Sequence, residues 1–306
     1  MSIPDFQTLM LPFLQLASDR QERSLRDAIE ALSVTFNLTE EQRTQRLPSG
    51  QQTTISNRVG WSGTHLKKAG LLESTRRGYI RITDRGLDVL KQNLSKIDLN
   101  FLDQFPSHRE FRTSSSSSNR KNNEQPSEQV GQSEKTPEEV MDDAFQSIQE
   151  GLATELLQRV KSCSPSFFER LVIDLLVKMG YGGTRKDAGR AVGKSGDGGI
   201  DGIINEDRLG LDLIYVQAKR WEGVVGRPEI QKFAGALQGQ RARKGVFLTT
   251  SSFSKEARDY AAFIDSKIVL IDGEMLGELM VSYNVGINTQ AVYEIKRIDL
   301  DYFAEE

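Results

Sequence analysis

Apolar residues recur every three or four positions in the first part of the chain, which is the spacing of amphipathic helices. These periodic stretches cover residues 6–17, 25–36 and 54–69. Ser24 and Thr83 stand directly before helical patterns and are predicted N-caps. Two short segments with strand character, residues 72–75 and 79–82, follow the third stretch. Helices followed by a two-stranded hairpin and a last helix have the order of a winged helix-turn-helix.

The second half of the chain alternates between helical and strand patterns. We predict helices over residues 137–161, 165–179 and 254–263 and another from Pro228 onward. The predicted strands cover residues 200–204, 213–219, 245–250 and 268–271. This order indicates a mixed α/β core.

A polar stretch with five consecutive serines separates the two halves. It contains almost no apolar residue, so it cannot bury enough surface to offset the entropy lost on ordering. We therefore predict a winged-helix domain over residues 1–104, a flexible linker over 105–137 and an α/β domain over 138–306.

Composition excludes several classes of protein. The chain has 306 residues, a formal net charge of −3 and one cysteine, Cys163, which rules out an internal disulfide and a cysteine-based zinc site. Its two histidines are too few and too scattered for a metal site. No apolar run approaches the roughly 20 residues that span a bilayer, and no signal-peptide pattern is present. We therefore expect a cytoplasmic protein with no membrane partner.

Positive charge is concentrated locally, although the whole chain is slightly acidic. Residues 54–86 carry seven Lys and Arg side chains against two acidic ones. A run of charge is often only a solvated face. Here, however, the basic residues stand on the third helix and the hairpin tip, where a winged helix meets the major groove and the DNA backbone. The candidate DNA contacts are Arg58, Lys67, Lys68, Arg76 and Arg77.

An acid and a Gln-x-Lys pair lie on two successive predicted strands. Side chains alternate faces along a strand, so Gln217 and Lys219 share one face while the residues between them pack inward. Asp201 joins them if the two strands pair across the turn at 205–210. Carboxylate and carbonyl oxygens are ligands for Mg²⁺, and a lysine can orient water or offset charge on a phosphorane-like transition state. The pattern indicates metal-assisted phosphodiester hydrolysis.

Several of these residues resemble the sequence of the bacterial Mrr restriction endonucleases. In the second half, the similar positions are Asp201, Gln217-x-Lys219, Phe168-Glu169, Gly180-Tyr181 and the sequence G-V-F-L-T-T-S at 245–251. In the first half, they are Asn57-Arg58-Val59-Gly60-Trp61 and Leu66-Lys67. The resemblance covers nearly the whole chain except the linker.

The resemblance implies a winged-helix domain followed by a restriction-endonuclease-like core of the PD-(D/E)xK type, with glutamine in place of the second acid. It implies that Asp201 binds the metal, Gln217 binds metal or water, and Lys219 is the catalytic lysine. Glu169 on the preceding helix matches an acid that supports the metal in such cores. The implied activity is Mg²⁺-dependent cleavage of double-stranded DNA carrying foreign methylation. Because one such site cuts one strand, we expect a homo-oligomer, a dimer or a tetramer.

Plain structural interpretations stand beside these roles. Asp201 could cap backbone donors in a glycine-rich turn, where Asp197 is the weaker ligand candidate. Glu169 could complete a Ser-x-x-Glu capping box that begins at Ser166. The Gln-x-Lys pair could be ordinary strand surface. Two other functions share the sequence features: a non-catalytic DNA-binding regulator and a structure-specific repair or junction nuclease with the same core.

Overall fold

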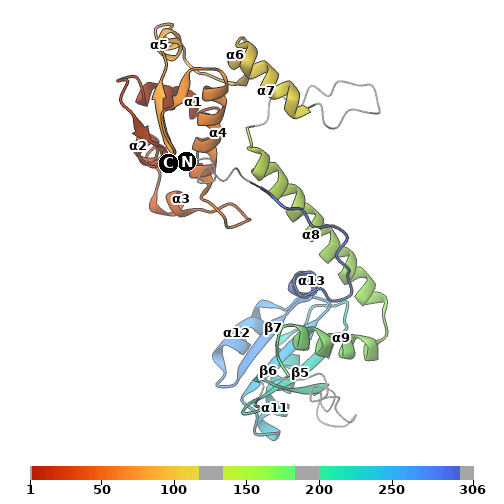
Figure 1. Ribbon diagram of the computed structural model, residues 1–306. Coiled ribbons are helices and arrows are strands. Elements are labelled where there is room, and N and C mark those ends of the chain that lie inside the picture. Colours follow the sequence, from red (N-terminus) through yellow and green to blue (C-terminus); the bar gives the residue numbers. More distant parts are fainter. Residues whose placement is uncertain (1, 117–133, 183–199, 208, 297–306) are drawn as a thin grey trace. The chain divides into compact units, whose positions relative to one another are not determined.

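The computed structural model describes residues 2–116, 134–182, 200–207 and 209–296 (Figure 1). It contains two compact units, one within residues 1–144 and one within residues 145–296. Within the described residues, no helix combines the length and the apolar character needed to cross a membrane.

The first unit is mostly helical with one small sheet. Its helices are α1 (Met10–Leu16), α2 (Leu25–Thr35), α3 (Glu40–Thr44), α4 (Thr54–Lys68), α5 (Asp84–Leu90), α6 (Leu99–Leu102) and α7 (Pro106–Ser116). Its strands are β1 (Arg23–Ser24), β2 (Leu72–Ser74) and β3 (Tyr79–Ile82), paired antiparallel in the order β1-β3-β2. The predicted hairpin and the helices at 25–36 and 54–69 are confirmed to within a residue or two, whereas the first helix begins at Met10 rather than near Phe6.

Side-chain caps set where several of these helices begin. Ser24 Oγ accepts a hydrogen bond from the Asp27 N–H at 3.0 Å, and Thr83 Oγ1 accepts one from the Gly86 N–H at 3.1 Å. Both caps were predicted from the sequence. Thr53 plays the same part for α4, because its side chain accepts from the Ser56 N–H.

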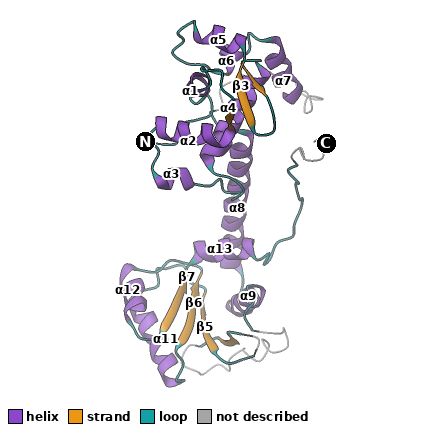
Figure 2. Cartoon of the chain, turned by 60° about the vertical axis from the view of Figure 1, so that its left-hand side comes forward, coloured by secondary structure: helices purple, strands orange, loops and turns teal. Residues whose placement is uncertain are grey.

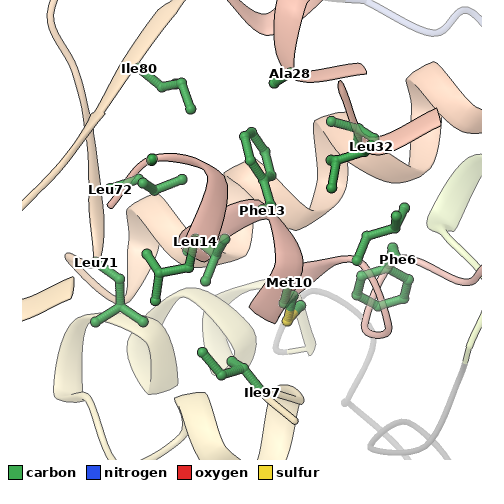
Figure 3. Close-up of a cluster of buried hydrophobic side chains, with 14 of the residues drawn as sticks. Phe6, Met10, Phe13, Leu14, Ala28, Leu32, Leu71, Leu72, Ile80 and Ile97 are labelled. Atoms are coloured by element: carbon green, nitrogen blue, oxygen red, sulfur yellow. The ribbon is translucent and has the colours of Figure 1, made fainter. Parts of the chain in front are cut away.

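The core of the first unit is built around α1. Phe13 is fully buried and lies among aliphatic side chains of α1, α2 and the small sheet (Figure 3). A Cβ atom added to Gly63 of α4 would lie 3.1 Å from the Phe13 ring. Glycine at this position therefore lets α4 approach α1 closely.

Helix α7 occupies the start of the segment that we predicted to be a flexible linker. His108 of α7 is buried, and its Nε2 lies 3.0 Å from His65 Nδ1 of α4. The other nitrogen of His108 lies 3.0 Å from Asp103 Oδ1. Burial lowers the pKa of His108 and brings that of His65 to about 4, which favours two neutral rings joined by hydrogen bonds.

The linker prediction was therefore wrong for residues 106–116, and the two histidines are neighbours rather than scattered. Polar composition hides this helix, because its burial depends on partners some 40 positions earlier, such as His65 with His108 (a separation of 43). Residues 117–133 of the predicted linker lie outside the described residues.

Helix α8 (Pro137–Ser162) starts in the first unit and ends in the second. A capping box sets its start: Thr136 Oγ1 accepts from the Glu139 N–H at 3.3 Å, and Glu139 Oε2 accepts from the Thr136 N–H at 2.9 Å.

The second unit is a three-layer α/β structure. Its remaining helices are α9 (Pro165–Lys178), α11 (Arg227–Gly239), α12 (Lys255–Phe263) and α13 (Gly273–Ser282). Its strands are β4 (Gly202–Asn205), β5 (Leu213–Lys219), β6 (Lys244–Thr249) and β7 (Lys267–Ile271), in the sheet order β4-β5-β6-β7. Helices α9 and α13 cover one face of the sheet, and α11 and α12 cover the other (Figure 2). The predicted mixed α/β core is confirmed.

Strand β5 is buried on both faces. Ile214 and Val216 face the cluster that includes α9, whereas Tyr215 faces the cluster that includes α11 and α12. The alternation of residues along this strand predicted one inward face and one polar face. A strand in the middle of a sheet with helices on both sides has no free face, so Gln217 is buried as well.

Candidate active site

Asp201 stands beside the carboxyl end of β5 because β4 and β5 pair antiparallel, with Gly202 opposite Val216. The Asp201 N–H donates to the Val216 carbonyl at 2.8 Å. In return, the Ala218 N–H donates to Asp201 Oδ2 at 2.7 Å. The predicted pairing across the turn is thus present, and it fixes the carboxylate within the ladder of two strands.

Burial raises the pKa of Asp201 above its ordinary value. The hydrogen bond from Ala218 and the positive charge of Lys219 act in the opposite direction, but they do not outweigh the burial. The ionised form of Asp201 is therefore less favourable in the fold than in water.

Glu169 of α9 lies close enough to Asp201 for the two charges to repel. Burial first, and then the Asp201 carboxylate, raise the pKa of Glu169, while Arg170 lowers it. The alternative role in a capping box with Ser166 is wrong. Ser164 is the N-cap of α9, and its Oγ accepts from the Phe167 N–H at 3.2 Å. Glu169 is thus not needed to start the helix.

Gln217 supplies a third oxygen. The residue is 4% exposed, and among the described residues its Oε1 atom has no hydrogen-bond donor. A buried carbonyl oxygen without a partner is uncommon, because it loses its bonds to water and gains nothing in return. The alternative in which Gln217 is ordinary strand surface is therefore wrong.

These oxygens form a donor set that suits a hard divalent cation. Asp201 directly precedes β4, and Glu169 of α9 is near enough to it for their charges to repel. Gln217 adjoins Ala218, whose N–H binds the Asp201 carboxylate. The described residues hold no group of three or more His, Cys, Asp and Glu side chains that could bind a metal. A cation at this place would therefore use the Gln217 oxygen or backbone and substrate oxygens in addition to the two acids. Asp197, the weaker candidate, lies outside the described residues.

Lys219 lies at the last position of β5, and its ammonium group has two close neighbours. It forms an ion pair with Glu229 Oε2, and it lies 4.1 Å from the centroid of the Trp221 ring. Neither neighbour could be identified from the sequence pattern. Glu229 follows Pro228 in the first turn of α11, where an acid is a common helix start, so its position gave no signal of a role at the site.

Arg58 does not have the role predicted for it. Its side chain is 17% exposed and forms an ion pair of 2.7 Å with Glu139, whose side chain is 10% exposed. The same guanidinium donates to the carbonyls of Ile3 and Pro4 at 2.6 and 3.1 Å. Most of its donors are therefore used inside the first unit. The prediction of Arg58 as a DNA contact was wrong, because the sequence does not show that Glu139 reaches it from 81 positions away.

The other four basic candidates have exposed side chains. Lys68 lies 5.1 Å from the centroid of the Phe111 ring, and Arg76 lies 3.6 Å from that of Tyr79. Arg76 also pairs with Glu22 at 3.0 Å, but 60% of its side chain stays exposed. Lys67 and Lys68 end α4, and Arg76 and Arg77 form the turn between β2 and β3.

Comparison with known proteins gives matches along most of the chain. A restriction endonuclease family model matches residues 160–280, and a model of the Mrr N-terminal domain matches residues 6–92. The chain is 38% identical to the type IV methyl-directed restriction enzyme EcoKMrr of Escherichia coli strain K12, over 99% of this chain and 100% of that protein. Among solved structures, the MspJI restriction endonuclease in complex with a 27-mer oligonucleotide is 21% identical, with a TM-score of 0.27 over 53% of this chain and 35% of that chain.

Asp201→Asn is expected to raise the melting temperature of the metal-free protein at neutral pH. Asparagine keeps an acceptor for the Ala218 N–H but removes a carboxylate whose ionised form is disfavoured by burial. Because the pKa of Asp201 is higher in the fold than in the unfolded chain, stability falls as the pH rises through the folded pKa. The gain should therefore be present at neutral pH and vanish below about pH 4.

Thermal melts with a chelator across this pH range measure the effect. Asp174→Asn, which removes an exposed carboxylate of α9, is the matched control and should change little. An Asp201→Asn protein that melts at or below the wild-type temperature at neutral pH contradicts the burial cost.

Glu139→Ala should destabilise the first unit by about 3–5 kcal/mol, since it leaves the Arg58 guanidinium largely buried without a counter-charge. Urea unfolding measures the change, with Glu110→Ala on exposed α7 surface as control.

In a DNA-binding assay, Arg58→Gln should show the wild-type salt dependence. A lower salt dependence would restore Arg58 as a DNA contact.

Proposed function

Since this chain belongs to the Mrr family of restriction endonucleases, we propose that the carboxyl end of β5 and the acids beside it form its active site. The chain is a DNA endonuclease. The observation that carries the site proposal is the hydrogen bond from the Ala218 N–H to Asp201, which holds a carboxylate at the end of β5 where Glu169 repels it. Gln217 of the same strand end has a buried Oε1 with no donor among the described residues. The proposed catalytic residues are Asp201, Gln217, Lys219 and Glu169.

Mg²⁺ is the cofactor that fits this set of oxygens best. Asp201, Glu169 and Gln217 would hold it. When bound, it would activate water and offset charge on the phosphate. Such an ion would relieve the repulsion between the two carboxylates and give the Gln217 oxygen a partner. Both are unfavourable features of the protein alone.

Lys219 would act on the phosphate directly. Its ammonium group provides three N–H donors and a positive charge, which can bind a non-bridging phosphate oxygen and orient the attacking water. Glu229 takes one of these donors. The other donors would bind the substrate.

We also propose that the first unit is a winged helix that docks on duplex DNA. The order α1-β1-α2-α4-β2-β3, in which the short α3 lies between α2 and α4, supports this assignment together with the sheet order β1-β3-β2. In such domains the third main helix enters the major groove and the hairpin meets the backbone. A Cβ atom on Gly60 of α4 would meet no atom within 4 Å, so this part of the helix surface is open for a close approach. The proposed contacts are Lys67, Lys68, Arg76 and Arg77.

The proposed substrate is foreign methylated DNA. This step rests on the relative from Escherichia coli, whose name describes it as methyl-directed. We further propose that the protein acts in the bacterial cytoplasm as a dimer or tetramer, because one such site cuts one strand and two are needed to break a duplex.

Asp201→Ala and Lys219→Ala should each lower cleavage of a methylated plasmid in the presence of Mg²⁺ by at least about 100-fold, because the first removes a ligand of the proposed metal ion and the second a positive charge that acts on the phosphate. DNA affinity should stay near the wild-type value. Gel-based cleavage and fluorescence anisotropy on the same preparations measure the two quantities.

Asp174→Ala serves as control and should cleave normally. The matched unmethylated plasmid and a chelator complete the design, and neither reaction should give cleavage. Full cutting by either site variant would remove that residue from the proposed site. A wild-type protein that binds DNA with Mg²⁺ present and never cuts it would favour the non-catalytic regulator.

Replacing the proposed DNA contacts one at a time should weaken binding similarly for all DNA sequences. Each of Lys67→Gln, Lys68→Gln, Arg76→Gln and Arg77→Gln should lower the slope of log affinity against log salt by about 0.9 when the residue contacts a phosphate. Lys91→Gln, an exposed lysine after α5, is the control. Unchanged slopes for all four variants would move the DNA-binding surface elsewhere.

A further inference from the structure

The ammonium group of Lys219 is paired with a carboxylate outside the proposed metal-binding set. Glu229 Oε2 forms the ion pair, whereas Asp201 acts on Lys219 only through its charge at longer range. The side chains of Lys219 and Glu229 are 17% and 26% exposed, so both charges are largely shielded from water. Trp221 covers another side of the ammonium group.

Both ends of this ion pair stand on rigid backbone. The Lys219 carbonyl accepts from Thr249 Oγ1 at 2.9 Å and from the Thr250 N–H at 3.3 Å, which holds the end of β5 against β6. Glu229 is in the first turn of α11, directly before Ile230, which is fully buried.

The connection between these two points is also fixed at its end. Val225 N–H donates to the Ser252 carbonyl at 2.8 Å, and Ser254 N–H donates to the Val225 carbonyl at 3.0 Å. The start of α11 is therefore attached to the segment that follows β6. Glu229 is held at a set place relative to β5 rather than on a free loop.

A lysine needs such a partner more than the other residues of the site do. The strand fixes only the Cα atom, and the ammonium group sits at the end of a flexible chain of four carbons. Glu229 binds one N–H, and the Trp221 ring attracts the cation from a second direction. The donors left over then point in a limited range of directions.

We propose that Glu229 is a positioning residue for Lys219, holding the ammonium group where a phosphate oxygen and the attacking water can use its remaining donors. The inference rests on the proposed catalytic role of Lys219. Glu229 carries negative charge and does not attract DNA. Its loss should slow the chemical step without weakening DNA binding, a combination that neither a DNA contact nor a purely structural ion pair produces.

The test compares Glu229→Gln, Glu229→Asp and the control Glu222→Gln in single-turnover cleavage of methylated DNA at saturating enzyme and Mg²⁺. Glu229→Gln should lower the rate by about 10–100-fold, the scale expected for a misplaced catalytic group. Glu229→Asp keeps the charge with a shorter reach and should recover part of that rate. Glu222→Gln removes an exposed carboxylate of the same connection and should match wild type. DNA affinity should not fall in any of them.

A spectroscopic readout separates positioning from general damage. In a Trp61→Phe background, Trp221 is the remaining tryptophan, since the chain has two. Glu229→Gln should change its emission, because the ammonium group is no longer held 4.1 Å from the ring centroid. Adding Lys219→Ala should remove any further effect of Glu229→Gln on that emission.

Three outcomes would overturn the inference: Glu229→Gln cleaving at the wild-type rate or faster, an equal loss of rate and DNA affinity, or unchanged Trp221 emission. The Lys219→Ala variant shows whether the proposed function of the site fails together with the role of Glu229. If that variant is inactive while Glu229→Gln is fully active, only the role of Glu229 is lost. If Lys219→Ala itself cleaves normally, the proposed function of the site falls with it.

Discussion

The antiparallel pairing of β4 with β5 is the constraint on which the candidate site depends. Because of this pairing, the Ala218 N–H donates to Asp201 Oδ2 at 2.7 Å. A backbone N–H of β5 that would ordinarily donate to a carbonyl of the neighbouring strand therefore binds a carboxylate instead. The parallel pairing of β5 with β6 then fixes the other side of the same strand end, with Lys219 opposite Thr249. A charged group is thereby held at the edge of a core that is apolar on both faces.

Much of this arrangement could be predicted because it is local. Strand β5 has the bounds that alternation predicted, and the turn after β4 makes its pairing with β5 the simplest one. Caps at Ser24 and Thr83 depend on residues three positions away. The predictions that failed depend on distant partners: Arg58 meets Glu139, and His65 meets His108 on α7. A sequence shows the charge of Arg58 but not the acid that neutralises it.

The same limit explains what was missed at the site. Glu229 could not be distinguished from an ordinary acid at a helix start, because its partner is set by how α11 packs against the sheet. For Glu169 the sequence left two roles open, because its Ser-x-x-Glu spacing also fits a capping box. Helix α9 begins two residues earlier, at Ser164 followed by Pro165, and this small shift frees Glu169 from the cap.

Glutamine in place of a second acid is the feature that would be shared by a working nuclease and one that had lost its activity. The surroundings of Gln217 help to distinguish these two kinds of protein. Its oxygen lacks a donor among the described residues, and the pKa values of both Asp201 and Glu169 are raised. Each of these features makes the fold less stable in the absence of a cation. A leucine in place of Gln217, or an amide in place of either carboxylate, would remove the corresponding cost. The proposed divalent cation would offset the two raised carboxylate pKa values and give the amide oxygen a partner, which favours the working nuclease over one that had lost its activity.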